Sequence, residues 1–154
     1  MDESKIQEFK IVIPGSLDYV SPVRNLVAEL LQVHDYSRKF AYRSEVIVDE
    51  ICSNAIQYGC KNRQSTVELT CLISEEKFEV HVKDEGGDHS DVQSLKKSIG
   101  HGNLDIDKEL TTIKKFARRG FGLEIVRMLS EKVELLIGEN NVTTLKVVRK
   151  KSLS

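Results

Sequence analysis

Three short segments carry side chains that could catalyse a reaction or bind a ligand, and the first lies at positions 50–59. Glu50 and Asn54 are four residues apart, so in a helix both side chains lie on one face. A carboxylate and a carboxamide on one face could hold a divalent cation and a water or hydroxyl. The alternative is the solvated rim of an amphipathic helix. For this segment alone we favour that alternative, because the E-x-x-x-N spacing is common by chance.

The second segment is the end of an alternating strand, where Asp84 follows Val82 and Lys83. Alternation places Asp84 on the same face as Phe78 and Val80. A buried carboxylate without a partner is costly, so a dedicated donor is expected, and the exocyclic amine of a purine would serve. Gly86 and the glycine after it allow a sharp turn and the close approach of a flat ligand. A charged strand end that runs into a turn is about equally favoured.

The third segment is a glycine-rich turn that opens a helix after two arginines, with Arg119, Gly120, Gly122 and Leu123 in sequence around Phe121. Free backbone N–H groups and the positive end of a helix favour a phosphate at such a turn. The arginine side chains add charge-assisted donors. A single G-x-G is weak support, and no strand leads directly into it as in a Walker or dinucleotide-binding loop.

Thr143 is a smaller signal near the C-terminus. It shares strand parity with Leu145 and Val147, so its hydroxyl is expected on the buried face near the end of the sheet. There it could contact Asp84 directly or through water. For this residue alone an ordinary strand threonine is the favoured interpretation.

Hydrophobic periodicity predicts the helices and strands that carry these residues. Paired strands with helices between them predict an α+β fold, a two-layer sandwich with helices on one face of a mixed, mostly antiparallel sheet. We predict strands at 9–13, 66–73, 78–83, 132–137 and 142–148. We predict a first helix from a Ser21 N-cap, with Pro22 at the first helical position, to about 34, a second over 38–58 with Gly59 as terminator, and a short third after Gly122.

Residues 88–119 have few large apolar side chains and are rich in Lys, Ser, Asp and Gly. A weakly patterned segment of this length inside a compact domain is usually a functional lid or is disordered. We therefore predict a single domain, 1–154, with a lid at about 88–119, and no linker or internal repeat.

Composition excludes several classes of protein. The chain has 154 residues, and 23 Lys and Arg against 24 Asp and Glu give a net charge of −1. This balance argues against a nucleic-acid binder. Three cysteines without C-x-x-C spacing indicate reduced thiols, and neither a signal peptide nor an apolar run long enough to span a membrane is present. We expect a cytoplasmic protein without membrane contact.

In this order, the three segments resemble the ATP-binding fold shared by histidine kinases, DNA gyrase, heat-shock ATPase chaperones and mismatch-repair ATPases, the histidine kinase-like (Bergerat) fold. Glu50 with Asn54 looks like its N box, and Asp84-x-Gly86 looks like its first glycine box. Residues 120–123 look like the second glycine box, and Val142-Thr143 looks like the terminal Gly-Thr strand with Val in place of Gly. The resemblance covers nearly the whole chain.

Within this superfamily the chain most resembles the bacterial anti-sigma-factor serine/threonine kinases of the partner-switching type. The matching segments are residues 11–14, Val23-Arg24 and 48–59. No dimerisation or phosphoacceptor-histidine domain is present, which fits this subgroup better than a histidine kinase. The chain departs from the family at Tyr58, where His is frequent, at Asp88, where a second Gly is frequent, and in its longer lid.

The resemblance implies a role for each site residue. Asp84 would accept the adenine amino group, Gly86 would line the base and Thr143 would complete the adenine end. Asn54 would coordinate Mg²⁺, and Glu50 would orient or deprotonate the attacking hydroxyl. The phosphates of ATP or ADP would be held by the second glycine box, comprising Arg119, Gly120, Gly122 and Leu123.

Three hypotheses follow. The first is a kinase that phosphorylates a small anti-anti-sigma (STAS-type) regulator, with a sigma factor as a possible second partner and a homodimer implied by the subgroup. The second is a nucleotide-gated partner-binding module of the same fold with little or no kinase activity, which the long lid and Asp88 motivate. The third is a domain in which the motif matches are accidental.

Overall fold

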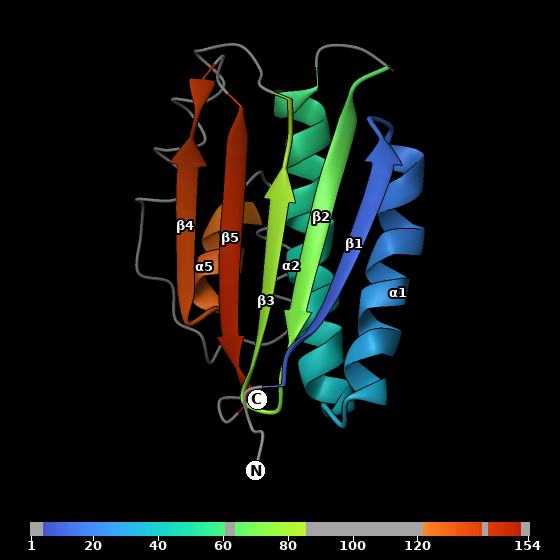
Figure 1. The fold of residues 1–154 in the computed structure, drawn as a ribbon, viewed down its shortest axis with the longest axis vertical. Helices are drawn as coiled ribbons and strands as arrows, with labels where there is room; N and C mark the ends of the chain where they lie inside the picture. The colour runs from blue at the N-terminus through green and yellow to red at the C-terminus, as the bar shows by residue number, and fades with distance from the viewer. Residues whose placement is uncertain (1–4, 61–63, 86–121, 140–141, 152–154) are drawn as a thin grey trace.

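The computed structural model describes residues 5–60, 64–85, 122–139 and 142–151. The elements in chain order are β1 (Gln7–Pro14), a 3-10 turn η1 (Leu17–Tyr19), α1 (Val20–Val33), α2 (Arg38–Gly59), β2 (Thr66–Ile73), β3 (Lys77–Lys83), α5 (Gly122–Met128), β4 (Lys132–Ile137) and β5 (Thr143–Lys150). Figure 1 shows the five strands side by side, with the helices behind them.

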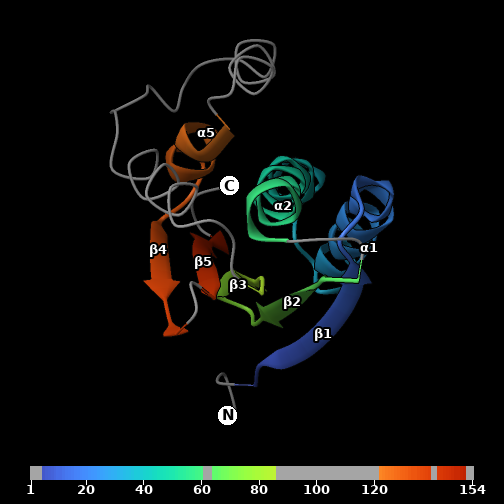
Figure 2. The same ribbon diagram turned by 90° about the horizontal axis from the view of Figure 1, so that it is seen from above.

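The sheet has the strand order β1-β2-β3-β5-β4, and every pairing between the described strands is antiparallel. Seen from above, α1, α2 and α5 all lie on one side of the sheet (Figure 2). The predicted α+β two-layer sandwich is therefore confirmed. The predicted lid at 88–119 lies wholly within 86–121, outside the described residues, and stays a prediction.

The core lies between the sheet and the helices. Alternate residues of β2 and β3 are fully or nearly fully buried, including Leu69, Phe78 and Val80, whereas their neighbours in the sequence face the other side of the sheet. The apolar stripe of α2, with Ile47 and Ile51, covers this face. The same alternation carries Asp84 into the buried layer, because Asp84 continues the parity of Phe78 and Val80 beyond the end of β3.

The sequence predicted the start of α2 correctly and the start of α1 wrongly. α2 begins after Ser37, whose hydroxyl accepts a hydrogen bond from the Phe40 amide at 3.0 Å. The predicted Ser21 N-cap of α1 is wrong, since α1 begins at Val20. A 3-10 turn, capped by Ser16, runs directly into the helix, so Pro22 lies within the first helical turn, where a missing N–H costs nothing.

Candidate functional site

Asp84 and Thr143 join the ends of two neighbouring strands. Both side chains are buried, and the Thr143 hydroxyl donates a hydrogen bond to Oδ2 of Asp84. The Thr143 amide donates to Oδ1 at 3.3 Å, and the Asp84 amide donates to the Thr143 carbonyl at 3.0 Å. Thr143 is thus a direct partner of Asp84, contrary to the interpretation as an ordinary strand threonine. The carboxylate is fixed in one orientation, and its two oxygens have about four acceptor positions in all.

Gly59, the last residue of α2, lies against this carboxyl group. A Cβ atom built on Gly59 would be 2.2 Å from both Cγ and Oδ2 of Asp84. Real Cβ atoms essentially never come this close to another heavy atom, so only glycine leaves space for Asp84 at this point. The sequence suggested Gly59 as a helix terminator and as the end of the segment 48–59 that resembles the partner-switching kinases. Its contact with Asp84 depends on how α2 packs on the sheet, and the chain pattern holds no signal for it.

Glu50 and Asn54 lie one turn apart on α2, and both side chains are half-buried. Burial raises the pKa of Glu50 to about 7, and the negative charge of Asp49 adds to the increase. A carboxyl group that titrates near neutral pH can accept a proton from a hydroxyl and release it again. Asp49 itself is paired with Arg24 of α1, with 3.1 Å between Oδ2 and the guanidinium nitrogen.

The phosphate end of the predicted site is described only in part. Gly122 is the first residue of α5, and Leu123, the second, has a buried side chain. Gly86, Arg119 and Gly120 lie outside the described residues. The structure therefore brings Asp84, Thr143 and the end of α2 together and leaves the contacts of the second glycine box as predictions.

The donor set fits a magnesium ion held jointly with phosphates. Within the described ranges, no three His, Cys, Asp or Glu side chains are grouped closely enough to hold a metal ion by themselves. Mg²⁺ in phosphoryl-transfer sites usually takes one or two protein ligands, and substrate phosphates and water supply the rest. Asn54 alone, with Glu50 one turn away, is compatible with that pattern.

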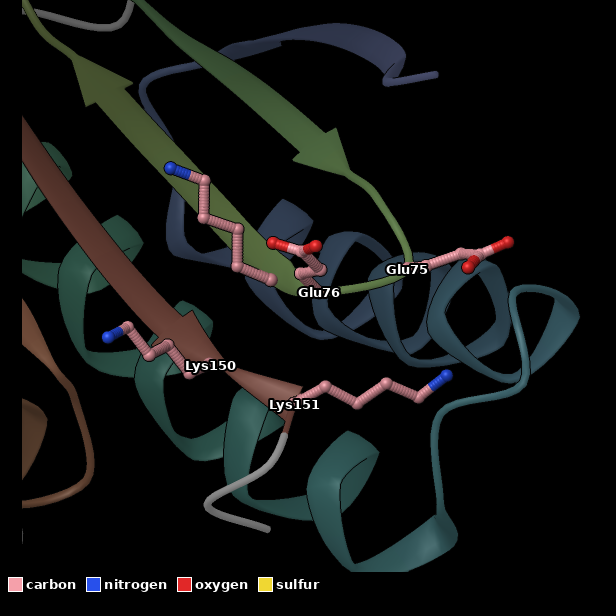
Figure 3. Close-up of a pocket in the computed structure, with 5 residues that line it drawn as sticks. Glu75, Glu76, Lys150 and Lys151 are labelled. Carbon is pink, nitrogen blue, oxygen red and sulfur yellow. The ribbon is translucent and has the colours of Figure 1, made fainter. Parts of the chain in front are cut away.

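A hollow of about 510 Å³ lies at the opposite end of the sheet (Figure 3). It is lined by side chains of both charges, namely Glu75, Glu76, Lys77, Lys150 and Lys151. Lys77 begins β3, whereas Asp84 follows its last residue, so the length of the strand separates this hollow from the carboxylate. It is therefore separate from the candidate site.

The chain matches a known protein family over most of its length. The family described as "Histidine kinase-like ATPase domain" matches residues 13–148. The chain belongs to this family. The matched range includes every residue that the sequence singled out for the site, from Glu50 to Thr143.

Relatives narrow the resemblance further. Two proteins of Bacillus licheniformis, both named "Serine-protein kinase RsbW", are 25% and 24% identical to the chain over 126 and 125 residues. Each alignment covers 80% of this chain and 74% of the relative. These matches confirm the predicted resemblance to the partner-switching serine kinases of the histidine kinase-like ATPase family.

A solved structure supports the fold independently. One chain in the crystal structure of the SiaB–SiaC complex from Pseudomonas aeruginosa superposes with a TM-score of 0.69 at 20% identity. The match covers 91% of this chain and 88% of that one. At this level of identity the likeness concerns the arrangement of helices and strands.

Among the described residues, no helix is long and apolar enough to cross a membrane.

Proposed function

We propose that the chain is a protein serine/threonine kinase that binds ATP between the Asp84–Thr143 pair and α5. The observation that carries the proposal is the fixed, buried Asp84 carboxylate. It is held by Thr143, lies against Gly59, and is at the end of the helix that bears Glu50. An orientated acceptor beside a glycine surface suits the amino edge of a flat base, and family membership supplies the nucleotide class.

In this proposal each residue has one task. Asp84 accepts a hydrogen bond from the adenine amino group, and Thr143 keeps the carboxylate in place. Asn54 would hold Mg²⁺, which neutralises charge on the phosphates when bound. Gly122 and Leu123, with the predicted Gly86, Arg119 and Gly120, would complete the base and phosphate contacts.

Glu50 acts on the substrate hydroxyl. The hydroxyl oxygen forms a bond to the γ-phosphorus, and the bond from that phosphorus to the bridging oxygen of the departing ADP breaks. The hydroxyl proton passes to the Glu50 carboxylate. A pKa of about 7 keeps a substantial fraction of Glu50 ionised near neutral pH and lets it act as an efficient proton acceptor.

The partner that we propose is a small STAS-type anti-anti-sigma protein in the cytoplasm, with a sigma factor as a second partner. The support is the pair of relatives named as serine-protein kinases and the neighbour solved within a two-protein complex. We also propose a homodimer. Tyr19, which caps the start of α1, and Leu26 and Val33 within the helix are exposed at seven-residue spacing, which suits packing against a second helix.

Thermal shift tests nucleotide binding. Ligand at about 100 times its dissociation constant adds about 2.7 kcal/mol to the free energy of unfolding. Millimolar Mg-ATP and Mg-ADP should raise the melting temperature, and Asp84→Asn should abolish most of that shift. A melting curve that neither nucleotide moves would contradict the proposal.

Phosphate transfer to the cognate regulator tests the kinase activity. Glu50→Ala should abolish transfer and retain nucleotide binding, whereas the matched control Glu75→Ala, an exposed acid at the opposite end of the sheet, should leave transfer unchanged. Nucleotide binding and partner capture without any phosphoprotein would instead identify the chain as a nucleotide-gated binding module.

A further inference from the structure

Arg149 is a buried cation that the proposed chemistry does not use. It lies near the end of β5, and its side chain faces the helices with a relative exposure of 4%. Its Nε atom donates to the Leu129 carbonyl at 2.8 Å. One terminal nitrogen donates to the Phe40 carbonyl and to Oγ of Ser44, both at 3.0 Å, and the guanidinium lies 4.0 Å from the centre of the Phe40 ring.

These partners are all neutral, which makes the charge expensive to bury. Burial lowers the pKa of Arg149 to about 10, with a further contribution from Arg43, so the side chain is still a cation at neutral pH. A large apolar side chain could fill the same volume without this cost. An apolar residue cannot supply the three directed hydrogen bonds that Arg149 makes, two to α2 and one to the residue that follows α5.

The hydrogen bonds of Arg149 join two elements that carry the proposed site. Leu129 immediately follows α5, whereas Phe40 and Ser44 belong to the first turns of α2. Figure 2 shows α5 and α2 on the same side of the sheet, with β5 below them. α2 carries Glu50 and Asn54, and α5 begins with Gly122 and Leu123.

We propose that Arg149 is a positioning residue that fixes α5 against α2 and thereby sets the phosphate end of the nucleotide site. This inference rests on the proposed function. α5 is short, and among the described elements it packs mainly on α2 and to a lesser extent on β4. Side chains such as Leu123 and Ile125 bury one face of the helix, and Arg149 adds a directed bond to the Leu129 carbonyl at its C-terminal end. That bond limits how far α5 can shift along α2, so the placement of its first residues depends on it.

The adenine end should not depend on Arg149. Thr143 and Arg149 lie on the same face of β5 but six residues apart, which is about 20 Å along a strand. Asp84 is held by Thr143 and faces Gly59, and neither contact involves α5. A change at Arg149 should therefore weaken binding of the phosphates and spare binding of the base, which general destabilisation of the fold would not do.

The test compares Mg-ATP with adenosine by calorimetric titration of the full chain. Arg149→Lys keeps the charge but loses the fork of donors, and it should raise the dissociation constant of Mg-ATP about tenfold or more while that of adenosine changes less than about threefold. Ser44→Ala removes one bond and should give a smaller effect of the same kind. The control is Lys150→Met, the next residue, whose exposed side chain lies 3.9 Å from Glu131.

Hydrogen exchange of the nucleotide-free protein supplies a second measurement. The Leu129 amide, bonded to the Ile125 carbonyl at 3.0 Å, should exchange faster in both Arg149→Lys and Ser44→Ala, while amides of β2 and β3 keep their protection. Unchanged exchange at Leu129 would overturn the inference. So would equal weakening of adenosine and Mg-ATP, which would leave Arg149 with a purely structural role.

The two measurements separate failure of the inference from failure of the proposed function. If the wild-type protein binds no nucleotide, the proposed function and the phosphate part of the inference are both wrong. Exchange at Leu129 then decides alone whether Arg149 holds α5. If the wild type binds Mg-ATP and the Arg149→Lys variant binds it equally well, only the inference is wrong.

Discussion

Replacing Gly59 by alanine is the sharpest test of how the candidate site is built. The added methyl group would lie 2.2 Å from Cγ and Oδ2 of Asp84 and 2.6 Å from its Cβ. Ordinary contact between carbon atoms needs about 3.5–4.0 Å, so the carboxyl group or the end of α2 must move by more than about 1 Å. Asp84 is short, buried and bonded to Thr143, so it cannot rotate away without losing those bonds.

The cost can be estimated from these contacts. Overpacking in a close-packed interior costs about 1–3 kcal/mol, and alanine in place of glycine in a helix recovers up to about 1 kcal/mol. The free energy of unfolding should therefore fall by about 1–2 kcal/mol, or about 2–8 °C in melting temperature. A displaced Asp84 also loses its hydrogen bond to the base, and bonds to charged groups contribute about 1.5–3 kcal/mol. Mg-ADP should bind about 10–100 times more weakly.

Thermal melting and calorimetric titration with Mg-ADP check both effects. The control is Gly138→Ala, where the nearest atom to the new methyl group is the Val142 carbonyl oxygen at 3.6 Å, and its stability should change by less than about 0.5 kcal/mol. Asp84→Gly should relieve the clash, so Gly59→Ala should destabilise that background much less than the wild type. Wild-type melting and wild-type affinity in Gly59→Ala would refute the close contact between α2 and Asp84.

Three further predictions concern charge and hydrogen bonding. Because the pKa of Glu50 is raised from 4.5 to about 7, its contribution to stability is full below pH 4.5 and is lost as pH rises to 7. In denaturant unfolding, Glu50→Gln should therefore have the same free energy of unfolding as the wild type at pH 4.5. At pH 8 its free energy of unfolding should be higher by about 1–2 kcal/mol, after allowance for solvent screening. An equal gain at both pH values would contradict this. In carboxyl NMR titrations, Asp49→Asn should lower the pKa of Glu50, because the Asp49 charge adds to the increase. Arg24→Gln should raise the pKa of Glu50 further, because Arg24 is paired with Asp49 and offsets its charge. An unchanged pKa of Glu50 in both variants would contradict this coupling. Thr143→Val should cost about 1–3 kcal/mol of stability and weaken binding of Mg-ADP, because it removes the hydroxyl that donates to the buried Asp84 carboxylate. Thr143→Ser should rescue both properties, and wild-type stability and affinity in Thr143→Val would count against that role.

Local pattern predicted most of the elements. Strict alternation over 66–73 and 78–83 fixes which side chains face the helices, and both strands lie where the alternation places them. The same period predicted that Asp84 and Thr143 face the buried layer. The start of α1 was wrong because Ser21-Pro22 is a strong local signal, whereas the 3-10 turn before it has no comparable pattern.

Sequence pattern could not predict the burial of Arg149, because the last strand was expected to end at 148, which left this arginine outside it. β5 instead continues to Lys150, since β3 offers paired backbone groups as far as Lys77. Parity then turns Arg149 toward Phe40 and Leu129, residues that no local rule relates to it. Its burial is a consequence of strand pairing and helix packing together.

The order of elements, the face on which each strand residue lies, and the family could all be inferred before the fold was known, because periodicity and motif order are properties of the chain alone. Which residues meet depends on the folded structure. Gly59 meets Asp84, and Thr143 bonds to it, because the C-terminal ends of α2 and β3 and the first residue of β5 lie at the same end of the sheet. Contacts between residues distant in the chain depend on packing of whole elements, and no spacing rule within one segment encodes them.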